Sequence, residues 1–281
     1  MADWNLGIRW TAGAVSRSGF EALRLSIWGA WRLFGAGAEY VVCVNSIPVE
    51  RARRLTGAVP DAVRWRDVTH ELSPLIAPFL DADMAQGVGW KFAPLRLFPD
   101  RHCLALDNDV ILWERPAALD AWLASGADCL VAEDVAASYG RFAARCGRDP
   151  RNTGIRGLPP GFDLGAALLA ELRGDARTLA SELDEQGLQV AALSRRRPPL
   201  CVTLDEVTIC SPVRQLYLGR CGAHFVGLNV RRLPPQLGGD AALRELRAHW
   251  RHQRPYLYEH VGLPLPAATP AGDLRDADRD L

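Results

Sequence analysis

Residues 6–45, "LGIRWTAGAVSRSGFEALRLSIWGAWRLFGAGAEYVVCVN", decide the fold class. The apolar run of residues 6–13 ends in a turn of small residues, which predicts a buried strand. Residues 18–34 place apolar side chains at helical spacing, and Ser18 is the expected N-cap. Residues 39–45 predict a second buried strand. Continuous apolar strands on either side of an amphipathic helix are typical of a parallel sheet that is covered on both faces.

The same alternation continues along the chain. Residues 48–57 begin at a proline, end at a glycine and predict a short helix, and residues 62–68 predict a third strand. Further strand-like runs follow at residues 103–106 and 127–134. Strand, helix, strand, helix, strand is the order of a doubly wound sheet, so we expect an α/β fold with a mostly parallel central sheet flanked by helices.

The pattern changes after residue 150. Residues 151–162 are rich in glycine and proline and are expected to be irregular. Beyond them we expect a helical region with a break near Gly174 (164–188), short strands (200–210 and 222–230) and a polar helix (239–253). We expect one domain over residues 1–265 and a disordered tail over residues 266–281, because a segment of Ala, Pro and Asp cannot form a core.

Charge and cysteine content limit the function classes. The 281 residues contain 33 Lys and Arg and 33 Asp and Glu, so no net field attracts nucleic acid and no nucleic-acid partner is expected. The seven cysteines include no Cys-x-x-Cys pair, which indicates free thiols in a reducing compartment. The apolar stretch 23–37 contains two arginines and is too short to span a bilayer. We therefore expect a cytoplasmic protein without a transmembrane segment; its oligomeric state stays open.

Two carboxylates and an amide, Asp107-Asn108-Asp109, stand between the apolar runs 103–106 and 110–113. In an extended segment, residues two apart point the same way, so Asp107 and Asp109 would present both carboxylates to one side. Mg²⁺ and Mn²⁺ prefer such oxygen ligands, and open α/β sheets bind ligands at the carboxyl ends of their strands. The pattern indicates a metal site, and a solvated turn is the alternative.

Here the sequence resembles a known family. The run "LALDNDVILWERP" (104–116) resembles the DxD region of GT-A nucleotide-sugar glycosyltransferases, most closely glycosyltransferase family 8, which includes glycogenin. Four further features occur in that family's order over residues 6–232: Lys91, the only lysine, sixteen residues before Asp107; "NTG" (152–154), similar to Asn-Ser-Gly; "LDE" (204–206), where Asp-Gln is frequent; and "HFVG" (224–227), similar to the late His-Phe-x-Gly.

The resemblance implies a GT-A-like domain that transfers a sugar from a nucleotide-diphosphate-sugar donor, with retention of configuration. The acceptor, a sugar, lipid or protein, stays open. The resemblance implies three sets of site residues: a Mn²⁺ or Mg²⁺ site at Asp107, Asp109 and His224; donor contacts from Thr11, Ala12, Gly13, Lys91, Asn108 and Gly227; and roles near the transferred sugar or the acceptor for Asn152, Asp205 and Glu206. Arg231 is the expected donor contact where the sequence departs from the family pattern.

The sequence also departs from the family pattern. The family usually continues its histidine motif with Lys-Pro-Trp, and that lysine, which holds the donor diphosphate, would fall on Val230. Arg231 and Arg232 follow directly and are the candidate replacements, although an arginine is a rigid fork and not a point charge. "GLPPGFD" (157–163) has no counterpart in the family signature, so the chain is expected to be a divergent branch.

Two other functions stay open. A non-catalytic descendant that binds a sugar nucleotide or a partner protein fits the missing lysine. A sugar nucleotidyltransferase is disfavoured, because no Gly-rich loop with Lys or Arg follows the first strand. Retention can proceed through a covalent intermediate on a carboxylate such as Asp205 or Glu206, or through front-face attack, and the sequence does not choose between them.

Overall fold

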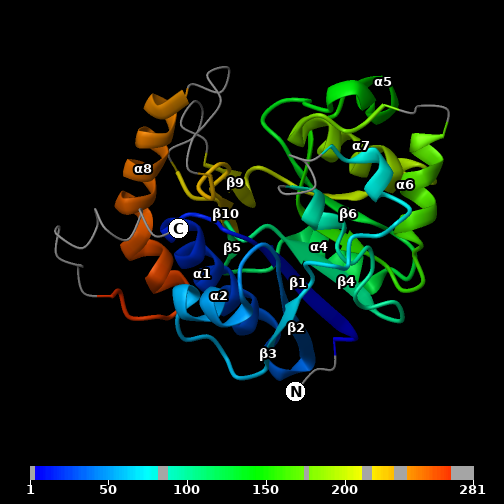
Figure 1. The fold of residues 1–281 in the computed structure, drawn as a ribbon. Coiled ribbons are helices and arrows are strands. Elements are labelled where there is room, and N and C mark those ends of the chain that lie inside the picture. The colour runs from blue at the N-terminus through cyan, green and yellow to red at the C-terminus, as the bar shows by residue number, and fades with distance from the viewer. Residues whose placement is uncertain (1–3, 82–87, 174–176, 211–216, 231–238, 267–281) are drawn as a thin grey trace.

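The architecture comes from a computed structural model that describes residues 4–81, 88–173, 177–210, 217–230 and 239–266 (Figure 1). The expected break near Gly174 lies outside these described residues. So do Arg231, Arg232 and all but the first residue of the expected tail.

A seven-stranded sheet forms the centre of the fold, in the order β3-β2-β1-β4-β7-β6-β8. Its strands are β1 (Leu6–Ala12), β2 (Ala38–Val44), β3 (Val63–Asp67), β4 (His102–Leu106), β6 (Leu130–Glu133), β7 (Arg151–Leu158) and β8 (Leu200–Val202). Neighbouring strands are parallel, except that β7 runs antiparallel to both β4 and β6. The predicted α/β class with a mostly parallel sheet is confirmed.

Helices cover both faces of this sheet. The α-helices are α1 (Arg17–Phe34), α2 (Val49–Thr56), α4 (Ala117–Ala124), α5 (Ala143–Cys146), α6 (Leu164–Leu172), α7 (Glu182–Ser194) and α8 (Gly239–His260). Strand β2 shows why a central strand carries apolar residues on both of its faces. Tyr40 and Val42 belong to the core cluster that contains α1, whereas Val41 and Cys43 belong to the cluster that contains α6 and α7. A strand that is buried on both faces has no polar side to show in the sequence.

The prediction that residues 151–162 are irregular is wrong for residues 151–158 and confirmed for residues 159–162. Residues 151–158 form β7, and its glycines lie beneath aromatic rings. A Cβ at Gly154 would lie 2.3 Å from Cε1 of His224, and one at Gly157 would lie 2.6 Å from Cε2 of Trp122. The glycines that suggested turns are therefore needed for close packing on a strand.

A second, three-stranded sheet contains β5 (Val110–Leu112), β10 (Gly222–His224) and β9 (Val207–Ile209), in the order β5-β10-β9. β5 is antiparallel to β10, and Val110 pairs with His224. The sheet shares a core cluster with α1 and α8, and Figure 1 shows α8 beside α1. The short strands expected within residues 200–210 and 222–230 are confirmed, and the expected polar helix extends to His260.

The N-terminus of α1 is tied to the turn that follows β10. The expected cap, Ser18, is wrong. The cap is Ser16, whose Oγ accepts the N–H of Gly19 at 3.0 Å and donates to the carbonyl of Leu228 at 2.7 Å. The backbone N–H of Ser16 also donates to the carbonyl of Asn229 at 3.0 Å. Two distant parts of the chain, residues 16–19 and 228–229, therefore meet at this helix end.

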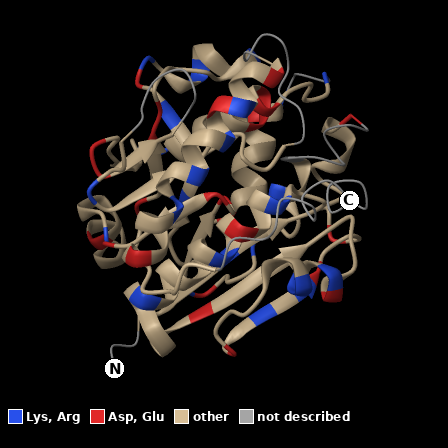
Figure 2. Cartoon of the chain, turned by 90° about the vertical axis from the view of Figure 1, so that its left-hand side faces the viewer, with Lys and Arg blue, Asp and Glu red and all other residues tan. Residues whose placement is uncertain are grey.

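Acidic and basic residues are mixed over the described chain, without a region of one sign (Figure 2). No helix in the described part of the chain combines the length and apolar character needed to cross a membrane.

Candidate active site

The segment Asp107–Asp109 joins the two sheets. It lies between the end of β4 and the start of β5, and the N–H of Val110 closes the turn by donating to the carbonyl of Asp107 at 3.0 Å. The N–H of Asp107 donates to the carbonyl of Gly154 in β7 at 2.8 Å. The carboxylates thus lie at the carboxyl end of a central parallel strand, the usual ligand position of an open α/β sheet.

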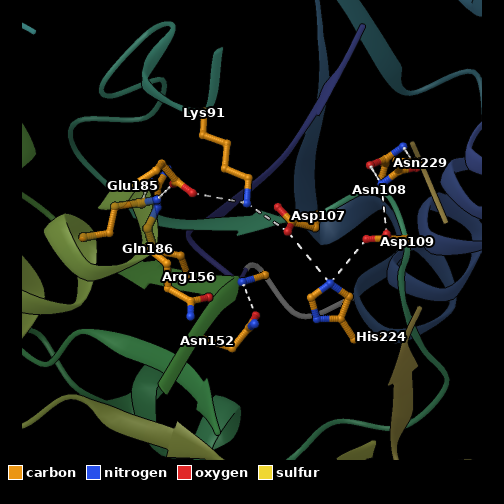
Figure 3. A network of polar contacts seen from close by, with 12 residues as sticks. Lys91, Asp107, Asn108, Asp109, Asn152, Arg156, Glu185, Gln186, His224 and Asn229 are labelled. Carbon is orange, nitrogen blue, oxygen red and sulfur yellow. Dashed lines mark hydrogen bonds and ion pairs between the residues drawn. The ribbon is translucent and has the colours of Figure 1, made fainter. Parts of the chain in front are cut away.

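The three predicted metal ligands lie together (Figure 3). Because Val110 pairs with His224, the imidazole is next to Asp109. His224 Nε2 lies 3.3 Å from Asp109 Oδ1 and 3.8 Å from Asp107 Oδ2. One ligand atom from each of the three residues lies within 4.8 Å of the other two.

This cluster fits a divalent cation better than it fits a solvated turn. Asp109 is only 2 % exposed, and its Oδ1 accepts no hydrogen bond from the described residues. A buried carboxylate oxygen without a donor is unfavourable. Carboxylates are the ligands that Mn²⁺ and Mg²⁺ prefer, and a neutral imidazole can complete such a set. The residues present fit the expected metal, and the solvated-turn alternative does not hold for Asp109.

The carboxylates also set the protonation of His224. Burial alone would lower the pKa of its imidazole, but the close contact with Asp109 and the charges of Asp109 and Asp107 outweigh burial, so the pKa is raised. An imidazolium would partly balance the two carboxylates when no cation is bound. A cation that binds at His224 must displace that proton.

Lys91 reaches the same carboxylates from the short 3₁₀ helix Val88–Phe92. Its Nζ donates to Asp107 Oδ2 at 2.9 Å and lies 3.9 Å from Oε2 of Glu185. Burial opposes the charged form, but the charges of Asp107 and Glu185 overcome it and raise the pKa of Lys91, so its ammonium group stays charged. The only lysine of the chain therefore lies beside the candidate metal site.

A buried polar network behind Lys91 was not predicted from the sequence. Glu185 accepts a hydrogen bond from Gln189, and Gln189 accepts one from Arg156 of β7. Burial raises the pKa of Glu185, although the charge of Lys91 opposes the shift. The i, i+4 spacing of Glu185 and Gln189 on one helix was the available signal, but the spacing alone does not show that this face is buried.

Asn152 lies next to the candidate metal ligands, on the β7 side (Figure 3). Its Oδ1 accepts the N–H of Gly154 at 2.7 Å, and its Nδ2 donates to Asp134 Oδ2 at 3.2 Å. Gln186 donates to the same oxygen at 3.3 Å. Asp134 and Gln186 are further polar residues that sequence reasoning missed. The position of Asp134 directly after β6 was the signal for it.

Thr11, Ala12 and Gly13 lie at the same edge of the sheet. Trp10 pairs with Leu106, so the end of β1 is level with the start of the Asp107–Asp109 segment. A Cβ at Gly13 would lie 2.6 Å from Oδ1 of Asn45, the residue that follows β2. Their contact with a donor base stays a prediction.

Asn108 points away from the ligands and forms an amide pair with Asn229 (Figure 3). Asn108 Nδ2 donates to Asn229 Oδ1 at 2.8 Å, and Asn229 Nδ2 donates to Asn108 Oδ1 at 2.7 Å. Asn108 is buried in this pair, and its contact with a donor stays a prediction. Gly227 lies in the turn after β10 with a φ of 89°, a conformation that favours glycine.

Asp205 and Glu206 are not part of the cluster, since they precede β9 at the end farthest from His224. Glu206 Oε1 accepts the N–H of Ala117 at 2.8 Å, and Oε2 accepts the N–H and the hydroxyl of Thr203 at 3.1 and 3.0 Å. These hydrogen bonds outweigh burial and lower the pKa of Glu206. Asp205 is exposed in the same turn. The geometry favours a structural role for Glu206 over the expected catalytic one.

The expected diphosphate contact, Arg231, lies outside the described residues. Val230, which stands where the family carries its lysine, is 39 % exposed. Among the described residues, Lys91 is the cation in contact with the candidate metal ligands.

Comparison with known proteins supports the fold. No protein-family model and no curated protein matches the chain. The galactosyltransferase LgtC, solved in complex with donor and acceptor sugar analogues, superposes with a TM-score of 0.54 at 12 % identity, over 96 % of this chain and 99 % of LgtC. An active-site mutant of LgtC gives a TM-score of 0.50 at 12 % identity, over 79 % of this chain and 87 % of the mutant. The resemblance to GT-A glycosyltransferases of family 8 is confirmed at the level of the fold, and the low identity indicates a divergent chain.

Proposed function

We propose that this protein transfers a sugar from a nucleotide-diphosphate-sugar to an acceptor, with Mn²⁺ or Mg²⁺ bound by Asp107, Asp109 and His224. One observation carries the proposal: two carboxylates and an imidazole meet at the carboxyl end of β4, in a fold similar to that of a galactosyltransferase, with Lys91 in contact with them. Asn152 lies beside the same cluster (Figure 3).

The site residues would divide the work according to their positions. Asp107, Asp109 and His224 would hold the cation, which supplies Lewis-acid stabilisation of the charge on a departing diphosphate. Lys91 would add a second positive charge beside the phosphates. The end of β1 and the residue after it, Thr11–Gly13, would bind the nucleoside. Asn152, held by Asp134, would face the transferred sugar.

We further propose that transfer retains configuration by front-face attack. The acceptor hydroxyl would attack the anomeric carbon on the face from which the nucleoside diphosphate leaves, and a departing phosphate oxygen would take the hydroxyl proton. The position of Glu206 supports this route over a covalent intermediate, because both of its carboxylate oxygens accept hydrogen bonds. Asp205 lies in the same distant turn.

The proposal is tested by incubating the purified protein with a panel of nucleotide sugars and Mn²⁺, with and without simple sugar acceptors, and measuring nucleoside diphosphate release. The panel should include nucleotide-activated galactose, the sugar of the transferase with the similar fold. Metal-dependent release that Asp109→Asn abolishes supports the proposal. Release that persists without any divalent cation contradicts the metal role.

The non-catalytic alternative rests on Val230, an exposed apolar residue where the family carries a lysine. It predicts donor binding with no turnover for any sugar and acceptor tried.

For the location of the protein we propose the cytoplasm, which the seven free cysteines support.

A further inference from the structure

Asn229 connects three parts of the chain that are distant in sequence. Its Nδ2 donates to Asn108 Oδ1 at 2.7 Å and to Asp109 Oδ2 at 2.9 Å, and its Oδ1 accepts from Asn108 Nδ2 at 2.8 Å. Its backbone carbonyl accepts the N–H of Ser16 at the start of α1. The side chain therefore joins the turn after β10 to the segment that carries the metal ligands, next to the N-terminus of α1 (Figure 3).

The contact with Asn229 gives the two carboxylate oxygens of Asp109 different surroundings. Oδ2 is held by the amide of Asn229, whereas Oδ1 faces His224 Nε2 at 3.3 Å and accepts no hydrogen bond from the described residues. A carboxylate that is held at one oxygen cannot rotate freely. Its second oxygen therefore stays directed towards the point where His224 and Asp107 converge.

We propose that Asn229 is a positioning residue that orients Asp109 for the cation. It also holds the turn after β10 against the segment Asp107–Asp109. The inference rests on the proposed metal site. Partners that orient metal ligands typically contribute tenfold to a hundredfold in metal affinity.

The amide is suited to this task in a way that other side chains of its size are not. Asn229 must donate to Asp109 and to Asn108 and also accept from Asn108, and only an amide provides both kinds of group at this length. A leucine of similar shape would fill the space but leave Asp109 Oδ2 and the Asn108 amide without these partners.

Gly19 packs tightly against the side chain of Asn229. A Cβ at Gly19 would lie 2.5 Å from Oδ1 of Asn229, so position 19 in the first turn of α1 has to be glycine for the amide to stay in place. Gly19→Ala is therefore a second way to displace Asn229. It would otherwise favour the helix, because alanine has the higher helix propensity.

The test is a titration of the whole chain with Mn²⁺ in the absence of nucleotide. Binding is measured by the loss of the electron paramagnetic resonance signal of free Mn²⁺. Asn229→Leu and Gly19→Ala should each weaken Mn²⁺ binding by about tenfold or more. Asn108→Ala should weaken it less, because the contact between Asn229 and Asp109 is retained. Parent-like affinity in both Asn229→Leu and Gly19→Ala would overturn the proposal.

Ser16→Ala is the matched structural control. It removes the cap of α1 and the hydrogen bond to Leu228 but leaves the amide contacts of Asn229 intact. It should lower the thermal unfolding midpoint without a tenfold change in Mn²⁺ affinity. If Ser16→Ala weakens binding as much as Asn229→Leu does, the turn matters only as structure and the positioning role is wrong. If Asn229→Leu does not fold, Gly19→Ala decides the question.

Asp109→Asn separates this inference from the proposed function. If Asp109→Asn binds Mn²⁺ as the parent does, the metal site itself is wrong, and the positioning role is wrong with it. If Asp109→Asn loses binding while Asn229→Leu and Gly19→Ala keep it, the metal site stands and only the role of Asn229 fails.

Discussion

The backbone of Gly154 lies directly beneath the imidazole of His224, so close that a Cβ at position 154 would lie 2.3 Å from Cε1 of the ring. Strand β7 and the end of β10 are thus fitted to each other at the candidate metal site. Asp107 joins the same contact, because its N–H donates to the carbonyl of Gly154.

Gly154→Ala should therefore displace His224 and weaken Mn²⁺ binding by about tenfold or more, as expected for loss of a ligand's orientation. Gly157→Ala, on the same strand, is the matched control, because its Cβ would meet Trp122 of α4 and not His224. Overpacking there should lower the free energy of unfolding by about 1–3 kcal/mol while the folded protein keeps its Mn²⁺ affinity. Equal Mn²⁺ affinity in the two variants would show that the glycine beneath His224 has no special role.

Lys91→Met should weaken nucleoside diphosphate binding by the contribution of one charge-assisted hydrogen bond, about 1.5–3 kcal/mol. Calorimetric titration of a nucleoside diphosphate with Mn²⁺ measures this loss. The double variant Lys91→Met, Glu185→Gln should recover stability but not affinity, since Glu185 no longer needs a countercharge. Recovery of affinity in the double variant would show that Lys91 contributes to stability and does not contact the donor.

Lys91→Met should also change the dependence of stability on pH. The pKa of Glu185 is raised in the folded chain, and removing the opposing charge of Lys91 should raise it further. The folded state then holds a proton that the unfolded state releases near pH 4.5, so the free energy of unfolding should fall as pH rises above that value. Urea unfolding at several pH values measures the slope, and a slope equal to that of the parent would show that Glu185 does not sense Lys91.

Glu206→Gln and Asp205→Ala should have different effects. Glu206→Gln weakens the hydrogen bonds to Ala117 and Thr203, so it should lower the free energy of unfolding by about 1–3 kcal/mol with little change in kcat/KM. Asp205→Ala changes an exposed side chain and should leave stability unchanged. If Glu206→Gln is as stable as the parent but has a much lower kcat, Glu206 is a catalytic residue and its structural role is wrong.

The sequence also predicts a cation after Val230. Arg231→Ala should reduce turnover by more than about tenfold, because a departing diphosphate needs a positive charge at this place, and Arg232→Ala should have little effect. In an extended segment the two side chains point to opposite sides, so only one of them is expected to reach the phosphates. Steady-state rates for both variants decide between them, and two parent-like rates would favour the non-catalytic alternative.

The sequence predicted those features that local patterns encode. Strands β1 and β2 are mostly apolar runs, β3 begins with alternating apolar and charged residues, and helices separate the three, so their parallel arrangement could be predicted directly. Asp107, Asp109 and Lys91 belong to one short region, and the site could be predicted from it together with the late histidine motif.

The remaining features depend on contacts between distant segments. Gly154 and Gly157 resemble turn residues until Trp122 and His224 are known to pack on them. Glu206 resembles a catalytic acid until its hydrogen bonds to Thr203 are seen. No local pattern in the sequence indicates the role of Asn229, because its hydrogen bond to Asp109 forms only in the folded chain.

The most direct test of the metal site is a calorimetric titration of a nucleoside diphosphate into the protein, with and without Mn²⁺, for the parent and for Asp109→Asn. Asp149→Asn, which changes an exposed carboxylate, is the charge-matched control. The parent and the control should bind the nucleoside diphosphate at least about tenfold more tightly with Mn²⁺, and Asp109→Asn should lose this gain. If Asp109→Asn keeps the full Mn²⁺-dependent gain, then Asp107, Asp109 and His224 do not form the metal site.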